Sequence, residues 1–220
     1  MEKNRYSTLL KMLFSAVFIL STVDQSSSMR RDQVAALRLN VNLAIESGDV
    51  EGVKYWAARG AKIKKIVNRG ENTPLHGVAY SGDERMAQVL IDNGAEVNRK
   101  NDEGYSSLHI AVMREHTNVV VILLDNKANI DEQGNAGNSP LHIAAMHGRR
   151  NVVEILLDRG ANIDLQDNDG FTAAHWAVIF EEREIVEILR ARGANFTIKS
   201  AAGQTPSDIA EKGLRESSGE

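Results

Sequence analysis

The segment SPLHIAAMHGRRNVVEILLDRGANID, residues 139–164, decides the fold of this chain. Ser139 is a favourable N-cap, and Pro140 can take the first helical position, where its missing N–H does no harm. The pattern predicts a short first helix that stops at Gly148 and a second, apolar helix within NVVEILLDR that ends before Gly160. The segment therefore predicts two short helices followed by a polar turn.

This two-helix unit recurs every 33 residues. Leu-His pairs begin at positions 75, 108 and 141, and Ala174-His175 and Ser207-Asp208 continue the register. A second series has the same period: Gly94-Ala95, Lys127-Ala128, Gly160-Ala161 and Gly193-Ala194. One such unit cannot bury its own apolar face, whereas stacked units can, so the period predicts a solenoid.

The repeated motifs resemble those of the ankyrin repeat. The helix starts that carry the resemblance are TPLH (73–76), SPLHIAA (139–145) and TPSDIA (205–210), and the matching tails are NVVEILLDRGANID (151–164) and REIVEILRARGANF (183–196). The resemblance covers roughly residues 34–214. It implies an all-α fold, an ankyrin-repeat solenoid of stacked helix-turn-helix units with short β-hairpin-like turns.

The period also divides the chain. We expect ankyrin repeats at residues 68–100, 101–133, 134–166 and 167–199, with an N-terminal capping helix and degenerate repeat at 29–67, a truncated capping repeat at 200–214 and a disordered tail at 215–220. The third repeat departs from the pattern, with Ser106-Ser107 in place of Thr-Pro and with Glu115 and Lys127 at glycine positions. The fifth has Thr172-Ala173-Ala174 and lacks both Pro and Leu. These departures predict lower local stability within the same fold.

Residues 1–28 have the anatomy of a signal peptide or leader. Lys3, Arg5 and Lys11 outweigh Glu2, and residues 12–23, MLFSAVFILSTV, are uncharged and mostly apolar. This run is shorter than the roughly 20 residues of a membrane-spanning helix. The pattern predicts a secreted or periplasmic protein without a membrane span in the mature chain. The alternative is a cytoplasmic protein whose leader is not cleaved.

Composition excludes several classes of protein. The chain of 220 residues has 26 Lys and Arg against 30 Asp and Glu, a formal net charge of −4, so we expect no nucleic-acid partner. It has no cysteine, which excludes disulfides, cysteine-bound metal and a thiol nucleophile. Because 42% of residues are hydrophobic, a folded core is expected.

Four histidines in register, His76, His109, His142 and His175, invite a metal site, but their geometry disfavours one. Equivalent positions on stacked helices lie about 8–10 Å apart, whereas zinc needs ligand nitrogens at about 2.0–2.1 Å. The resemblance implies instead that each histidine bonds the backbone of its own and the adjacent repeat. We therefore expect no metal.

Two other motifs fit a site poorly. The acidic loop at 164–170 has Leu165 at the first calcium-ligand position when Gly170 is aligned to the EF-hand glycine. The glycosylation sequon at Asn195 is interpreted as a chance match. Phosphate-binding glycine loops and serine-nucleophile motifs do not occur in the sequence. We therefore expect no cofactor and no catalytic residues.

The residues that the repeat does not explain predict a protein-binding surface. In ankyrin-like repeats, the turn and the exposed end of the first helix line a concave face. The turn position holds Tyr105, Asn138 and Phe171, and the helix ends hold Tyr80, Met113, Met146 and Ile179 beside Arg114, His147 and Phe180. The four helix-end residues are spaced by 33 and predict an apolar stripe. The alternative is partial burial of this stripe against the next repeat or turn.

The resulting hypothesis is an exported, monomeric ankyrin-repeat scaffold that binds another protein through its concave face and does no chemistry. By analogy, a secreted ankyrin protein resembles a host-interaction factor of a microbe that lives in or on a host. The alternative is a cytoplasmic regulatory or adaptor subunit. A remote third hypothesis is a hydrolase that uses His142, His147 or His175 with a nearby aspartate.

The leader gives a direct prediction. Residues 1–21, or slightly more, should be missing from the mature protein, because the uncharged run ends near Val23. N-terminal sequencing and intact-mass analysis check this. The full 24.2 kDa chain in a cytoplasmic fraction would contradict it.

Overall fold

The computed structural model describes residues 36, 39–59, 62–63 and 70–211, so the predicted leader and the tail at 215–220 lie outside it. The described residues form helices joined by turns and loops, without a strand among them. The first helices of the repeats are α4 (Pro74–Ser81), α6 (Ser107–Met113), α8 (Pro140–Met146) and α10 (Ala173–Ile179), and the second helices are α3 (Val50–Ala58), α5 (Glu84–Asp92), α7 (Thr117–Asp125), α9 (Arg150–Asp158) and α11 (Arg183–Ala191). Residues 39–46 and 206–211 are also helical.

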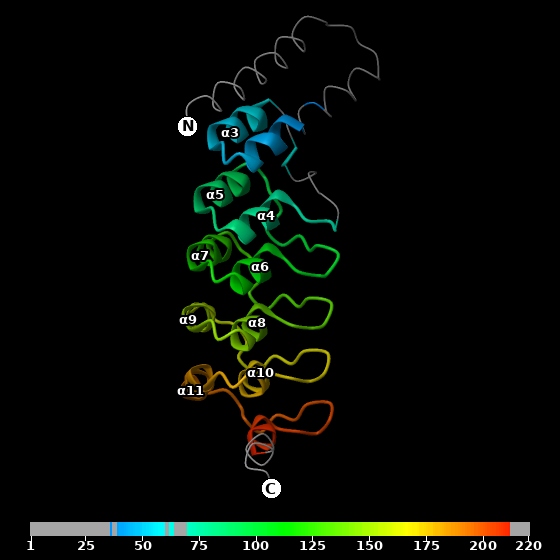
Figure 1. The fold of residues 1–220 in the computed structure, drawn as a ribbon, viewed down its shortest axis with the longest axis vertical. Coiled ribbons are helices and arrows are strands. Elements are labelled where there is room, and N and C mark those ends of the chain that lie inside the picture. The colour runs from blue at the N-terminus through cyan, green and yellow to red at the C-terminus, as the bar shows by residue number, and fades with distance from the viewer. Residues whose placement is uncertain (1–35, 37–38, 60–61, 64–69, 212–220) are drawn as a thin grey trace, which may run out of the picture.

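These helices form two columns. The first helices contact one another in the order α4, α6, α8, α10, and the second helices follow from α3 to α11. Loops project from the column of first helices, on the side away from the second helices (Figure 1). The predicted all-α solenoid is therefore confirmed.

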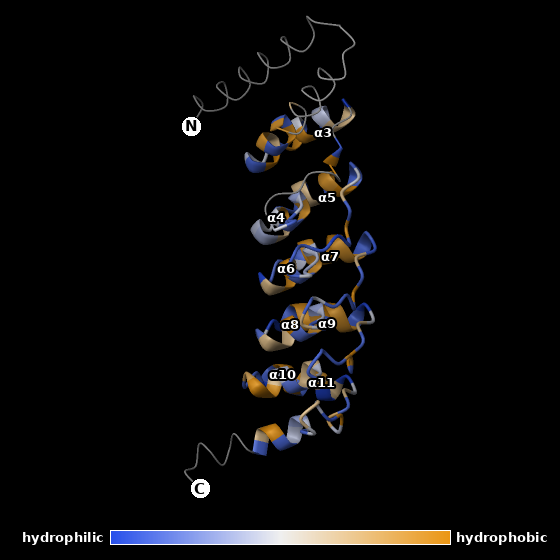
Figure 2. Cartoon of the chain, turned by 90° about the vertical axis from the view of Figure 1, so that its right-hand side faces the viewer, coloured by the Kyte–Doolittle hydropathy of each residue, from blue (hydrophilic) through white to orange (hydrophobic). Residues whose placement is uncertain are grey.

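The core lies between the columns. Leu75, Leu108 and Leu141 of the first helices are at most 1% exposed, and Leu90 and Leu156 of the second helices are fully buried. Each buried leucine stabilises the fold by about 1.5–3 kcal/mol. Hydrophobic residues concentrate along the helices, and hydrophilic residues occupy the loops (Figure 2).

A histidine in each first helix joins that repeat to the next. The backbone N–H of Thr73 donates to Nδ1 of His76 at 3.0 Å, and His76 Nε2 lies 3.0 Å from the carbonyl oxygen of Tyr105. Because a backbone N–H can only donate, Nδ1 is unprotonated, and the Nε2–H donates to the carbonyl.

The same arrangement recurs along the stack. His109, His142 and His175 donate to the carbonyl oxygens of Asn138, Phe171 and Gln204 at 3.2, 3.0 and 3.1 Å. The expectation that these histidines bond their own and the adjacent repeat is confirmed. Both ring nitrogens are engaged, which leaves none for a metal ion.

Burial of these rings predicts acid sensitivity. Desolvation lowers the pKa of His109 from 6.5 to about 4. The unfolded chain therefore takes up a proton as the pH falls through 6.5, but the folded chain does so only near 4. The contribution of the neutral His109 ring to the free energy of unfolding is fully present above pH 6.5. It is lost as the pH falls toward 4, by up to about 3 kcal/mol.

Urea unfolding at about pH 7.5 and about pH 5 tests this effect. His109→Asn should be less stable than the wild type at the higher pH, because the bond between repeats is lost. It should also lose less stability on acidification, because the titrating group is gone. The matched control is His147→Asn at an exposed helix end. Equal pH dependence in His109→Asn and the wild type would contradict the assignment.

The third repeat carries two local defects, as its sequence predicts. Lys127 has a φ of 66°, where Gly94, Gly160 and Gly193 of the other repeats have 87°, 84° and 85°. A side chain in this left-handed region bears a steric cost that glycine avoids. Ser107 is 1% exposed, and its hydroxyl has no hydrogen-bond partner among the described residues.

Repairing both defects should stabilise the chain. Ser107 occupies the first position of α6, where α4 and α8 have proline, so Ser107→Pro needs no new backbone geometry. Ser107→Pro with Lys127→Gly should raise the unfolding free energy by roughly 1–2 kcal/mol. Denaturant midpoints measure the gain, and an unchanged or lower midpoint would refute it.

Candidate protein-binding face

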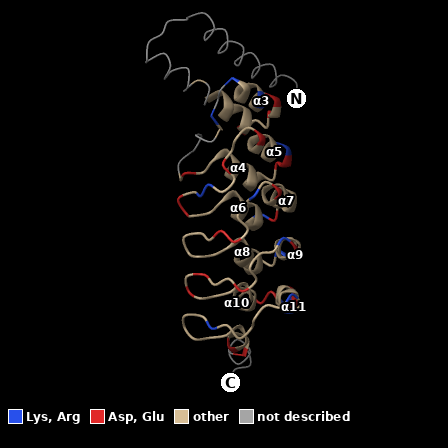
Figure 3. Ribbon diagram, turned by 180° about the vertical axis from the view of Figure 1, so that it is seen from behind, with Lys and Arg blue, Asp and Glu red and all other residues tan. Residues whose placement is uncertain are grey.

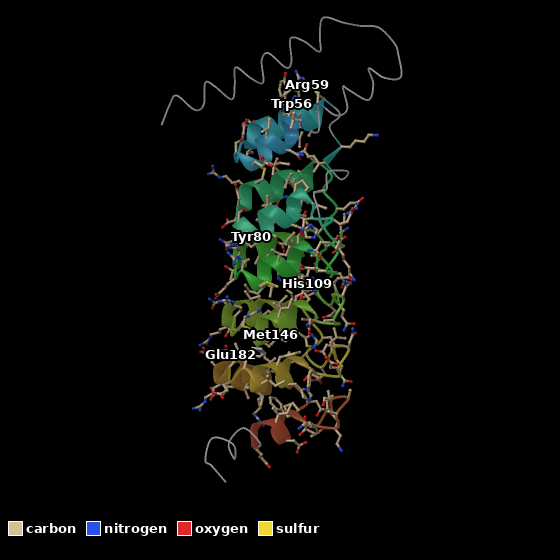
Figure 4. The ribbon with its side chains drawn as sticks, turned by 45° about the vertical axis from the view of Figure 1, so that its right-hand side comes forward. Trp56, Arg59, Tyr80, His109, Met146 and Glu182 are labelled. Carbon is tan, nitrogen blue, oxygen red and sulfur yellow. The ribbon has the colours of Figure 1, made fainter. Side chains whose placement is uncertain are left out.

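The predicted stripe lies at the carboxyl ends of the first helices. These ends point away from the loops, and Tyr80, Met146 and Glu182 follow one another down this edge of the stack (Figure 4). Tyr80 is 57% exposed and Ile179 39% exposed, whereas Met113 and Met146 are partly buried. Met113 also packs against the core. The stripe is therefore exposed at its ends and partly buried in its middle.

The residues beside the stripe are held by the neighbouring repeat. The guanidinium carbon of Arg114 lies 4.1 Å from the ring centroid of Tyr80, a cation–π contact. His116 Nε2–H donates to the carbonyl oxygen of Tyr80 at 3.0 Å. Arg149 pairs with Glu115 at 2.8 Å. These contacts fix the helix ends before any partner arrives.

The three predicted turn residues lie at the base of the loops. The carbonyl oxygens of Tyr105, Asn138 and Phe171 accept the histidine bonds between repeats. Their side chains are partly buried, and the Tyr105 ring lies 5.4 Å from that of His109. The structure therefore gives these residues a part in stacking.

The loop tips themselves are exposed and were not among the predicted site residues. They are residues 102–103, 135–136 and 168–169, just before the glycine of each turn. Acidic residues occur in the loops of several repeats (Figure 3). The sequence could have indicated these exposed tips, because each lies directly before the glycine of a predicted turn.

Hydrogen bonds join each loop to the next. The backbone N–H of Asp102 donates to the carbonyl oxygen of Gly70 at 3.0 Å, and that of Ala201 donates to the oxygen of Asp169 at 2.8 Å. Gln133 Nε2 donates to the carbonyl oxygen of Gln166 at 2.9 Å. The loops thus form one hydrogen-bonded layer, which reduces the ordering entropy lost on binding.

Aromatic side chains gather on the fifth repeat. The Trp176 ring lies 5.4 Å from that of Phe171 and 6.0 Å from that of Phe180, which is 49% exposed. The indole N–H of Trp176 donates to Asp167 Oδ2 at 2.8 Å. We call Phe171, Trp176 and Phe180 the aromatic row. Trp176 was missed in the sequence because its helix position holds Gly77 and Ile110 in other repeats.

The three histidines of the hydrolase hypothesis do not form a catalytic pair with an aspartate among the described residues. His142 and His175 use both ring nitrogens in backbone and side-chain capping bonds, and burial lowers the pKa of each. The buried carboxylate of Asp167 accepts bonds from Trp176 and from two backbone N–H groups. His147 is exposed at the end of α8.

Within the described residues, no cluster of three metal-ligating side chains is present, and no helix has the length and hydropathy to cross a bilayer.

Comparison with known proteins agrees with this geometry. The sequence model for ankyrin repeats (3 copies) matches residues 41–134 and 122–200. The chain is 29% identical over 79 residues to a transient receptor potential cation channel subfamily A member 1 homolog of Caenorhabditis elegans, covering 36% of this chain and 6% of that protein. It is 34% identical over 82 residues to the BTB/POZ domain and ankyrin repeat-containing protein NPR1 of Malus hupehensis, covering 37% and 13%.

A third relative is the regulatory protein NPR4 of Arabidopsis thaliana, 35% identical over 79 residues, covering 36% of this chain and 13% of that protein. The chain thus matches no more than 13% of the length of these three relatives. What the matches share is the repeat architecture, which implies a scaffold for protein–protein interaction and is typically not enzymatic. The chain belongs to the ankyrin-repeat family.

Proposed function

We propose that this chain is an exported scaffold that binds another protein through the face formed by its loops and the ends of its first helices. The observation that carries the proposal is the exposure of Tyr80, Ile179 and Phe180 on that face. Large apolar side chains contribute little to folding when they remain in water, but they contribute strongly to binding when a partner covers them.

The rigidity of the surrounding structure supports this proposal. Tyr80 and Ile179 lie three repeats apart on helices that stack through intervening repeats. The loop layer and the histidine bonds hold the repeats in register. A partner would therefore meet several anchors at fixed spacing and lose little binding energy to ordering.

The proposed export rests on the basic start and the uncharged run at residues 12–23. An exported ankyrin scaffold would act outside the cell that makes it, and a microbial host-interaction factor is the form we propose. Similarity to a relative named as a regulatory protein, NPR4 of Arabidopsis thaliana, favours a second candidate, a cytoplasmic regulatory or adaptor subunit. Both candidates use the same binding face.

The binding face predicts a separation between stability and affinity. Ile179→Ser should change the unfolding free energy by under about 1 kcal/mol, because the side chain is 39% exposed. Met113→Ser should cost about 1–3 kcal/mol, because its side chain packs against the core. Tyr80→Ser with Ile179→Ser should weaken partner binding by at least about 2 kcal/mol.

The partner for this measurement can be trapped with a photo-crosslinker at exposed Ser81, beside Tyr80. A crosslinker at exposed Arg85 on α5 is the positional control. The matched variant is Arg85→Ser with Glu187→Ser, two exposed positions on second helices, which should keep full affinity. Full affinity in Tyr80→Ser with Ile179→Ser, or equal trapping from Arg85, would move the binding site off this face.

A further inference from the structure

Phe180 of the aromatic row differs from the exposed tyrosines Tyr55 and Tyr80 in having no described cation over its ring. Arg59 lies 3.4 Å from the ring centroid of Tyr55, and Arg114 lies 4.1 Å from that of Tyr80. Arg190 covers Phe196 in the same way, at 4.2 Å. Within the described residues, no lysine or arginine lies over any ring of the aromatic row. Phe180, at 49% exposed, is the member of the row that is most open to a ligand, and Trp176 packs beside it.

Bonding around Trp176 orients its ring and enriches it in electrons. Its N–H donates to the carboxylate of Asp167, which is 8% exposed and is held by the backbone N–H groups of Asp169 and Phe171 at 3.0 and 2.8 Å. A carboxylate acceptor strengthens the negative potential of the indole face. Tryptophan is also the side chain that binds cations best through its face.

The charge of the surrounding segment has the matching sign. Residues 167–182 contain four carboxylates, from Asp167, Asp169, Glu181 and Glu182, and no lysine or arginine. Asp169 and Glu181 are exposed, and neither forms an ion pair with a described cation. The equivalent segment of the preceding repeat, 134–149, carries Arg149 and no carboxylate side chain. The segment 101–116 carries three carboxylates beside Arg114, so the segment of the fifth repeat is the most negative of these equivalents and lacks a basic residue.

We propose that the aromatic row is the docking site for a lysine or arginine side chain of a basic peptide segment in the partner. This inference rests on the proposed function and names the chemistry of the segment that the face takes. The cationic group lies over the faces of Trp176 and Phe180, and the carboxylates of residues 167–182 attract the flanking positive charges. A neutral apolar segment would gain nothing from those carboxylates.

Peptide binding to the full chain tests the proposal. The probes are three labelled synthetic peptides, each with four repeats of Arg-Ser-Gly, Gln-Ser-Gly or Glu-Ser-Gly, measured by fluorescence anisotropy. The arginine peptide should bind at least about tenfold more tightly than the glutamine peptide, and the glutamate peptide should bind most weakly. Equal binding of the arginine and glutamine peptides would overturn the inference.

Variants of the row separate stacking from long-range attraction. Phe180→Leu keeps the surrounding carboxylates and an apolar side chain at this exposed position. It should weaken binding of the arginine peptide by about fivefold or more, because the aromatic face is lost. Phe180→Tyr should retain affinity because an aromatic face remains. Tyr55→Leu, at an exposed aromatic residue of α3, is the control and should change nothing. Full affinity in Phe180→Leu would overturn the inference.

Two further outcomes are decisive. Lys212 and Arg215 lie in the sequence beyond the described residues, so Lys212→Gln with Arg215→Gln tests whether the chain supplies its own cation. Peptide affinity in this variant should stay within about twofold of that of the wild type. A rise of about tenfold would indicate that the chain's own cations compete for the site, and it would overturn the proposal of an external ligand.

A second outcome separates this inference from the proposed function. If Tyr80→Ser with Ile179→Ser loses the trapped partner and the wild-type chain binds the arginine and glutamine peptides equally, this inference fails and the proposed function stands. Retention of partner binding in that double variant rejects the proposed function itself.

Discussion

The hydrogen bond from each helix-capping histidine to the next loop is the constraint on which the rest of the structure depends. His142 accepts the backbone N–H of Ser139 at 3.0 Å and donates to the carbonyl oxygen of Phe171, so one ring both starts a helix and sets the position of the following repeat. The histidine side chain is buried, which strengthens the bond, and the bond requires a neutral imidazole with its proton on Nε2. Stacking, loop order and acid sensitivity all follow from this requirement.

Contacts across repeats show how local sequence changes are accommodated. Gly82 has a φ of 80°, and a Cβ added there would lie 2.6 Å from Nδ1 of His116 in the next repeat. At the equivalent position of the third repeat, Glu115 stands in place of glycine, and the next repeat supplies Arg149, which pairs with its carboxylate. Size and charge are matched between neighbours, as expected where each repeat contacts only the one before and the one after.

Function is placed on side chains that the stacking does not use. Leucines, alanines and histidines of the first helices are committed to the core and to the histidine bonds. The helix ends and loop tips are free to vary, and there the chain carries Tyr80, Ile179, the aromatic row and the acidic loops. The same rigidity that makes the fold regular also holds these varied side chains at fixed separations for a partner.

The sequence by itself determined the repeat, the stacked helices and the left-handed backbone expected at Lys127, and its resemblance to the ankyrin repeat implied the double role of the histidines. The repeat, the helices and the left-handed turn positions depend on residue type and a fixed spacing, and both can be read from a repeating sequence. Only the tertiary structure decided exposure within the stripe, where Met113 packs against the core and Ile179 does not. It also decided that Arg114 covers Tyr80 and that Trp176 joins Phe180. These outcomes depend on which side chain of the neighbouring element reaches each position, and a 33-residue spacing does not contain that information.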